Sequence, residues 1–276
     1  MSNLAYRILV ALIAIPAIIF ITLQGGWVFL FFVLLLTVLG MREFYKFAEV
    51  KGIQPIRWLG IFCGINLVAM FYSYNANDIS LFPFLESGFF ILLLIAGIIE
   101  LFRNKPSPLN NLSTTFFGIL YVAGCFGALV GLREMNLIAH PNANSYTIIS
   151  LFATIWICDS SAYFVGKFFG KHKLFERVSP KKTWEGAIAG LLMAVLFSIV
   201  ARNNYLRFIS IYDAIIIGII VGVIGQTGDL FESLLKREAD VKDSSTIIPG
   251  HGGVLDRFDS LLFVAPVVYV YFKVIS

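Results

Sequence analysis

Charged residues gather near the C-terminal end of a chain that is otherwise strongly apolar. The chain is 58% hydrophobic and 14% charged, yet residues 225–260 alone carry eleven Lys, Arg, Asp and Glu side chains. Four polar residues there are spaced so that a helix would carry them on one face: Asp229, Ser233, Lys236 and Asp240. This segment therefore predicts a helix face that carries carboxylate, hydroxyl and ammonium groups together.

The next segment combines a glycine-rich turn with two further carboxylates. Residues 249–253 read PGHGG, and the backbone N–H groups of such a turn can approach a phosphate closely. Asp256 and Asp259 fall three residues apart, so they would be neighbours in the first turn of a helix that starts near Leu255. Mg²⁺ usually takes one or two carboxylates, water and phosphate oxygens. The spacing alone thus predicts a site for a metal ion and a polyphosphate.

These positions together resemble the signature of the phosphatidate cytidylyltransferase family, also called CDP-diacylglycerol synthases. The pattern S-x-x-K-R-x4-K-D-x5-P-G-H-G-G-x-x-D-R-x-D occupies residues 233–259. A second segment, SPKKTWEG at residues 179–186, is similar to the family's S-P-K-K-T-x-E-G segment. The resemblance implies that CTP and phosphatidate react to form CDP-diacylglycerol and pyrophosphate in phospholipid biosynthesis, with Mg²⁺.

Nucleotidyl transfer needs in-line positioning and neutralisation of negative charge more than covalent chemistry, and this suggests a role for each group of residues. One or two divalent ions, which a monovalent ion could accompany, would be held by Asp229, Asp256 and Asp259. The catalytic groups would be Lys236, Arg237 and Arg257, which stabilise the transferred phosphorus and pyrophosphate, with Ser233 orienting an oxygen. The substrate-binding residues would be Lys167, Ser179, Lys181, Lys182, Thr183, Lys242, His251, Gly252 and Gly253.

Several of these residues also have a structural interpretation. Arg257 could form a salt bridge with a neighbouring aspartate instead of contacting phosphate. Asp243, a further candidate site residue, could pair with Lys242 and close the loop. His251 could stabilise its turn, and Pro180 with Glu185 could serve as capping groups near the start of a helix.

Asp159 is a candidate site residue because it lies within an apolar run. A carboxylate there is costly unless it is paired, hydrated or bound to a ligand. By contrast, other isolated acids and histidines are predicted to be interfacial or surface groups: Glu43, Glu49, Glu100, His140 and His172. Cys63, Cys125 and Cys158 lie in apolar runs without a CxxC pattern, which favours packing over redox or zinc chemistry.

The composition predicts an all-α polytopic membrane protein, because the mean hydropathy is +0.84. A spanning helix needs about 20 mostly apolar residues. Nine segments fit this rule, at residues 6–23, 27–44, 58–74, 81–102, 114–132, 146–164, 185–201, 212–226 and 259–274. We therefore expect N-terminal transmembrane helices in residues 1–153 and a C-terminal transmembrane catalytic region in residues 154–276.

The distribution of Lys and Arg predicts the orientation of these spans. With nine spans, 17 of the 21 Lys and Arg residues fall on the side of the N-terminus. By the positive-inside rule that side is cytoplasmic. The signature would then face the cytoplasm, where CTP is, at a bacterial-type inner membrane.

The expected partners are CTP, phosphatidate and the bilayer, and a homodimer is a further assembly to test. Nucleic acid is not expected, because no basic stripe is interleaved with stacking aromatic residues outside the apolar spans. Two alternatives remain open at this point. An ion-coupled transporter would also have polytopic helices with intramembrane carboxylates, and a related enzyme could join CTP to an archaeol-type or polyprenol lipid.

Overall fold

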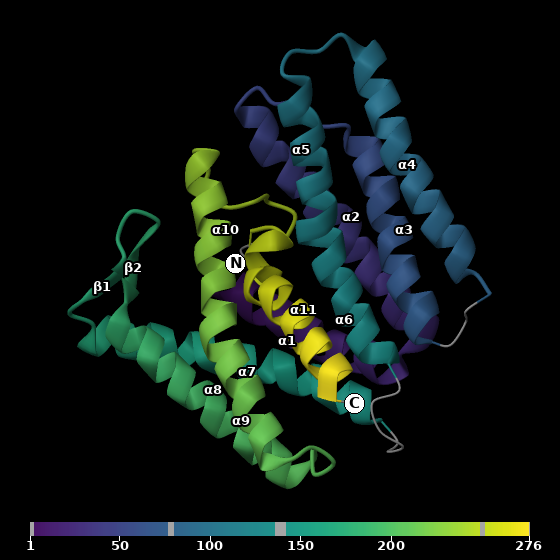
Figure 1. Cartoon of the computed structure of the whole chain (residues 1–276). Helices are drawn as coiled ribbons and strands as arrows, with labels where there is room; N and C mark the ends of the chain where they lie inside the picture. The colour runs from purple at the N-terminus through teal and green to yellow at the C-terminus, as the bar shows by residue number, and fades with distance from the viewer. Residues whose placement is uncertain (1–2, 77–79, 136–141, 249–251, 276) are drawn as a thin grey trace. The chain divides into compact units, whose positions relative to one another are not determined.

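A computed structural model describes residues 3–76, 80–135, 142–248 and 252–275 (Figure 1). Nearly all of these residues are helical, and they fall into two compact units that are described separately below. The first unit comprises residues 1–136 and 238–257, and the second comprises residues 137–237 and 258–276. The sequence-based division at residue 153 stays a prediction.

The first unit is a bundle of apolar helices. Its elements are α1 (Asn3–Gln24), α2 (Gly26–Val50), α3 (Arg57–Asn75), α4 (Phe82–Arg103), α5 (Pro108–Gly118), the π-helical η1 (Ile119–Gly124) and α6 (Cys125–Glu134). α5, η1 and α6 run on as one helix of 27 residues. Small residues allow close packing here, as in other membrane helices: a Cβ on Gly40 of α2 would lie 3.1 Å from Val122 of η1.

The second unit contains the remaining helices and a hairpin. Its elements are α7 (Ala143–Phe169), β1 (Lys173–Phe175), β2 (Ser179–Thr183), α8 (Trp184–Asn204), α9 (Ile211–Ile220), the π-helical η2 (Val221–Gly225), α10 (Gln226–Glu238) and α11 (Leu255–Ile275). α9, η2 and α10 form one helix of 28 residues. The last residue of α10 and the first three of α11 belong to the first unit.

Local chemistry explains where two of these helices begin. Thr183 ends β2 and caps α8, because its side-chain oxygen accepts a hydrogen bond from the Gly186 N–H at 3.2 Å. Ser210 and Asp213 form a reciprocal capping box at the start of α9. Because α9, η2 and α10 form one continuous helix, this capping box fixes the start of the helix whose last part, α10, carries the signature residues.

Seven helical segments of the described chain are long and apolar enough to cross a membrane. They are Gly26–Val50, Phe82–Arg103, Pro108–Glu134, Ala143–Phe169, Trp184–Asn204, Ile211–Glu238 and Leu255–Ile275. The protein is therefore an all-α polytopic membrane protein. α1 and α3 lie at the two other predicted spans, but α1 contributes only a shorter apolar segment, Leu12–Gln24, and α3 is not among the seven. The number nine and the orientation remain predictions.

Two features of the polar segments differ from the expectation. The structure adds a two-stranded antiparallel hairpin, in which Lys173 lies opposite Thr183 and Phe175 opposite Ser179. The predicted helical stripe from Asp229 to Asp240 was wrong at its last member. α10 ends at Glu238, and Asp240 has a left-handed backbone with φ of 56°.

Asp240 instead forms an ion pair with Lys51, directly after α2. The distance from the Lys51 Nζ to an Asp240 carboxylate oxygen is 2.8 Å, within the first unit. The hydrogen bond from Lys51 lowers the pKa of Asp240 below its usual range, and the same bond raises the pKa of Lys51. Asp240 therefore contributes to the anchoring of the connection between α10 and α11, not to a polar helix face.

Candidate active site

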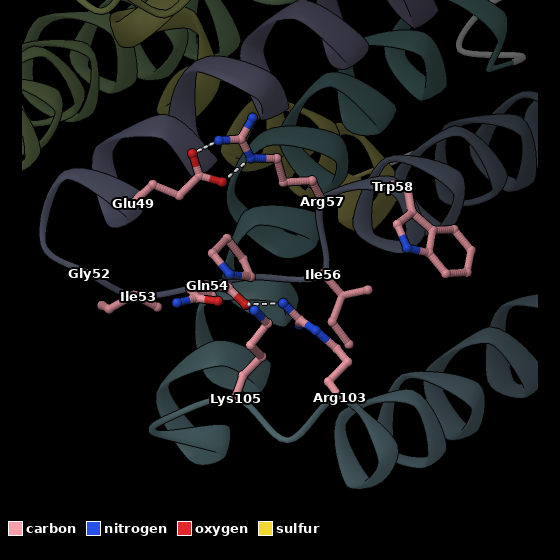
Figure 2. A pocket seen from close by; sticks show the side chains of 10 residues that line it. Glu49, Gly52, Ile53, Gln54, Ile56, Arg57, Trp58, Arg103 and Lys105 are labelled. Carbon is pink, nitrogen blue, oxygen red and sulfur yellow. Dashed lines mark hydrogen bonds and ion pairs between the residues drawn. The ribbon is translucent and has the colours of Figure 1, made fainter.

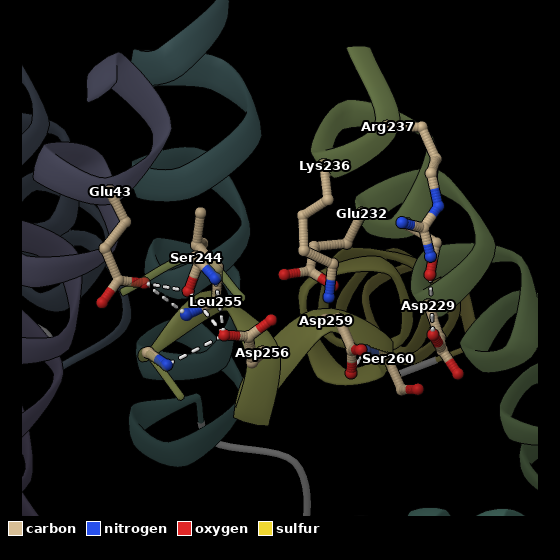
Figure 3. Close-up of polar contacts among 12 residues, drawn as sticks. Glu43, Asp229, Glu232, Lys236, Arg237, Ser244, Leu255, Asp256, Asp259 and Ser260 are labelled. Atoms are coloured by element: carbon tan, nitrogen blue, oxygen red, sulfur yellow. Dashed lines mark hydrogen bonds and ion pairs between the residues drawn. The ribbon is translucent and has the colours of Figure 1, made fainter. Parts of the chain in front are cut away.

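Four carboxylates from three helices of the second unit interact electrostatically. Asp229 and Glu232 lie on α10 and Asp259 lies on α11 (Figure 3). Asp159 lies on α7, and the charges of Asp229, Glu232 and Asp159 all act on Asp259. We call these four residues the carboxylate cluster. Glu232 is fully buried, whereas Asp229 and Asp259 are half-buried and Asp159 is exposed. The cluster therefore offers carboxylate oxygens to a ligand outside it.

Glycine at two helix contacts explains how these side chains meet. A Cβ on Gly228 would lie only 2.6 Å from the backbone carbonyl oxygen of Asp259, so α10 and α11 are in backbone contact one residue before Asp229. A Cβ on Gly190 of α8 would lie 3.0 Å from the carbonyl oxygen of Cys158, the residue before Asp159. Both carboxylates thus follow points where no larger side chain fits.

Two lysines pair with members of the cluster. Lys182 of β2 lies 2.6 Å from Asp229, and Lys236 lies 2.6 Å from Glu232 on the same helix. Of these six side chains, four are formally negative and two positive, so two negative charges remain to be offset. Like charges held together on membrane helices favour binding of a cation.

The other predicted site residues of the second unit lie around α10 and the hairpin. The Ser233 hydroxyl lies 3.5 Å from an Asp229 carboxylate oxygen, and the Arg237 Nε donates to the backbone carbonyl of Val178 at 3.3 Å. The Lys167 ammonium lies 5.8 Å from the ring centroid of Tyr163. Ser179 and Lys181 belong to β2, where Lys181 is exposed. Arg237 therefore connects α10 to the hairpin, in contact with the segment that carries Lys182.

One buried carboxylate that sequence reasoning missed holds the described parts of the connection between α10 and α11, within the first unit. We call these parts, residues 239–248 and 252–254, the motif loop. Glu43 of α2 is 3% exposed and accepts four hydrogen bonds. They come from the Ser244 hydroxyl at 2.8 Å, the Ser245 hydroxyl at 2.6 Å, the Val254 N–H at 3.0 Å and the Leu255 N–H at 2.9 Å (Figure 3).

Glu43 thus satisfies backbone donors at the N-terminus of α11, where a helix has N–H groups without intrahelical partners. The prediction that Glu43 is an interfacial charge was wrong. The available signal was its position within the apolar run at 27–44, where an acid requires a partner.

Asp256 holds the same loop from the other side. One carboxylate oxygen of Asp256 accepts from the Ser244 N–H at 2.7 Å and the Gly253 N–H at 2.9 Å. It also lies 2.9 Å from the Ser244 hydroxyl, whose single hydrogen is shared between Asp256 and Glu43. Gly252 has φ of +83°, and a Cβ on it would lie 2.5 Å from the same Asp256 oxygen. Gly252 therefore leaves room for Asp256, whereas a Cβ on Gly253 would meet Ser244 and Glu43. Its assignment as a metal ligand stays a prediction.

The remaining candidate site residues of the signature are Lys242, Asp243, His251 and Arg257. Lys242 and Asp243 are exposed on the motif loop, and the described residues include no ion pair between them. Arg257 is exposed in the first turn of α11. His251 lies outside the described residues, so its predicted contact with phosphate is untested.

A three-ligand metal site is not preformed in the described part of the chain. No three His, Cys, Asp or Glu side chains there are grouped closely enough to hold an ion. The oxygen donors and the excess negative charge nevertheless fit Mg²⁺, which is commonly bound by one or two carboxylates together with substrate phosphates. The metal roles of Asp229, Asp256 and Asp259 remain predictions.

The fold and the cluster define a polytopic membrane protein with a site of acidic and basic side chains, and comparison with known proteins specifies its family. The model of the cytidylyltransferase family matches residues 5–275. The chain is 35% identical to the phosphatidate cytidylyltransferase of Bacillus subtilis (strain 168), over 98% of this chain and 97% of the relative. It is 34% identical to the Synechocystis protein of the same name, over 98% and 96% of the two chains.

A protein of that name from Staphylococcus aureus (strain COL) is 31% identical, over 96% of this chain and 97% of the relative. The chain therefore belongs to the cytidylyltransferase family and is a nucleotidyltransferase.

Proposed function

We propose that this enzyme joins CTP and phosphatidate to form CDP-diacylglycerol and pyrophosphate in phospholipid biosynthesis. An oxygen of the phosphatidate phosphate forms a bond to the α-phosphorus of CTP, and the bond between that phosphorus and the oxygen leading to the β-phosphate breaks. The names of the relatives support the two substrates. The meeting of Asp159, Asp229, Glu232 and Asp259 with two lysines is the observation that carries the location of the site.

The protein's task in this reaction is positioning and charge neutralisation. The phosphate of phosphatidate is ionised at neutral pH, so the attacking oxygen needs no strong general base. Lys182 and Lys236 lie beside the cluster and are suited to offset the charge of the triphosphate and of the departing pyrophosphate. Arg237 can offer two-point contact to a phosphate through N–H groups other than its Nε.

Magnesium is the cation that this donor set suits best. Asp229 and Asp259 would hold it, with Asp256 as the third predicted ligand. When bound, Mg²⁺ neutralises negative charge on the phosphates of CTP. Ser233, which lies near Asp229, would orient one oxygen of that carboxylate or of the substrate.

The proposed orientation has the site at the cytoplasmic face of a bacterial-type inner membrane. It is supported by the excess of Lys and Arg on one side of the predicted spans. A lipid phosphate lies at the bilayer surface and CTP arrives from water, so a polar site at the ends of helices suits both substrates.

The test is incorporation of radiolabelled CTP into lipid by the purified protein in phosphatidate-containing vesicles. We expect a labelled product that migrates as CDP-diacylglycerol, and we expect Asp259→Asn to abolish it. Glu86→Gln is the control, because it also replaces a carboxylate by its amide but at an exposed position of α4 outside the signature, and it should keep its activity. Label that enters lipid only from an archaeol-type or polyprenol phosphate would contradict the assigned acceptor. Ion flux without any use of CTP would instead indicate a transporter.

A further inference from the structure

A pocket of about 480 Å³ lies in the first unit, at the connections that follow α2 and α4 (Figure 2). Its polar lining includes three cationic side chains, those of Arg57, Arg103 and Lys105, and one carboxylate, that of Glu49. Trp58 lies at its edge. None of these residues belongs to the signature or to the carboxylate cluster, so the proposed reaction does not explain them.

Buried hydrogen bonds fix the walls of this pocket. Asn111 is fully buried; its side-chain oxygen accepts from the Gln54 N–H at 2.8 Å, and its amide nitrogen donates to the Pro106 carbonyl at 2.9 Å. One side chain therefore connects the two segments that line the pocket. Thr115, also fully buried, accepts from the Ile56 N–H at 2.9 Å. The pocket is thus preorganised, which reduces the cost of binding a ligand.

The charges of the pocket suit a singly charged anion. Arg57 forms an ion pair with Glu49, and Arg103 forms one with Glu100 at 2.8 Å. Lys105 is exposed and adds a positive charge that neither of these pairs offsets. Each guanidinium has five N–H donors in a planar fork, and the ion pairs use only some of them. A phosphodiester carries one negative charge and acceptor oxygens for these donors, whereas a nucleoside triphosphate carries several charges.

Position and exposure indicate a lipid rather than a soluble anion. The candidate spans Gly26–Val50 and Phe82–Arg103 both end at the pocket, so it lies at the end of the apolar helices. Trp58 is 56% exposed, and Leu101 and Phe102 next to Arg103 are 77% and 78% exposed. Tryptophan is typical of membrane interfaces, and exposed apolar side chains beside it suit acyl chains.

We propose that this pocket binds the phosphodiester headgroup of an anionic membrane phospholipid. The headgroup phosphate accepts hydrogen bonds from Arg57, Arg103 and Lys105, and the acyl chains follow the exposed surface of α4. Such a site would hold a bulk lipid of the membrane, independently of the lipid that reacts with CTP.

The test is native mass spectrometry of the purified full-length protein with phosphatidylglycerol or phosphatidylcholine added, without CTP. We expect the protein to retain phosphatidylglycerol more strongly than phosphatidylcholine. The dissociation constant for phosphatidylglycerol should rise about fivefold in Lys105→Gln, because one Lys near a membrane surface contributes about 1 kcal/mol to the binding of anionic lipid. Lys46→Gln is the matched control, because Lys46 is exposed on α2 and does not line the pocket. Its dissociation constant should change less than twofold.

A second variant and a competition complete the test. Arg57→Gln should also weaken retention of phosphatidylglycerol, and both pocket variants should keep the thermal unfolding midpoint of the parent within a few degrees. Equal retention of the two lipids, or equal weakening by Lys46→Gln, would overturn the proposal. Displacement of phosphatidylglycerol by equimolar inorganic phosphate would assign the pocket to free phosphate and would overturn the lipid assignment.

Discussion

Replacement of Glu43 by glutamine tests whether the motif loop must be held in place for the reaction. Each Glu43 oxygen accepts from one serine hydroxyl and one backbone N–H: one from Ser245 and Val254, the other from Ser244 and Leu255. Glutamine replaces one of these oxygens with an NH₂ group. The serine hydroxyl can then accept a hydrogen bond from that NH₂ group, but the backbone N–H of Val254 or Leu255 loses its acceptor. A buried donor without an acceptor costs about 1–3 kcal/mol.

Even the lower value corresponds to about a fivefold shift toward an open loop. We therefore expect Glu43→Gln to reduce CTP incorporation about fivefold or more and to lower the unfolding midpoint in detergent by a few degrees. Glu86→Gln makes the same chemical change at an exposed position of α4 and should leave both quantities unchanged. Ser245→Ala should be milder than Glu43→Gln, because it removes a donor together with its requirement for an acceptor. Parental activity in Glu43→Gln would refute the importance of this contact.

Three further predictions follow from the packing, the surface charges and the cation. Gly228→Ala should lower the unfolding midpoint and CTP incorporation, because overpacking typically costs about 1–3 kcal/mol. Gly97→Ala should be neutral, because its Cβ would meet nothing within 4 Å. Equal effects of the two changes would contradict the close contact between α10 and α11. Lys51→Gln should raise the pKa of Asp240 toward its usual value in a carboxyl NMR titration, because the hydrogen bond and charge of Lys51 lower that pKa in the parent. The stability that this pair adds is present above the pKa of Asp240 in the unfolded chain and is lost as the pH falls through its lower pKa in the folded protein. An unchanged titration would contradict the pair. Chelation of divalent ions should abolish CTP incorporation and Mg²⁺ should restore it, and activity that persists in chelator would contradict the metal assignment.

The apolar runs predicted the positions of the helices, because a membrane span has a minimum length and few charges. They did not predict that the span at 212–226 continues into α10, since η2 and α10 follow without a break although the sequence turns polar at Asp229. Asp240 was misplaced because regular spacing does not reveal where a helix ends. A left-handed residue outside glycine leaves little trace in a single sequence.

Two features could not be predicted because they depend on contacts between distant segments. Glu43 and Ser244 are 201 residues apart in the sequence, and their hydrogen bond forms only after α2 and the motif loop have packed together. The hairpin of β1 and β2 lacks the apolar alternation of a half-buried strand, since β2 reads SPKKT and contains no apolar residue other than its proline. The Gly-rich signature was recognisable, but Gly252 makes room for Asp256 and Gly253 makes room for Ser244 and Glu43, which spacing alone did not indicate.

The central claim is that carboxylates of α10 and α11 act together as one site. A double-mutant comparison of Asp229→Asn, Asp259→Asn and the combined variant, with CTP incorporation measured across a series of Mg²⁺ concentrations, tests this claim most directly. Groups that act as a unit have non-additive effects, so each single variant should lose about as much activity as the double variant, and added Mg²⁺ should rescue none of them fully. Losses that multiply in the double variant, or near-parental activity in either single variant, would contradict the claim.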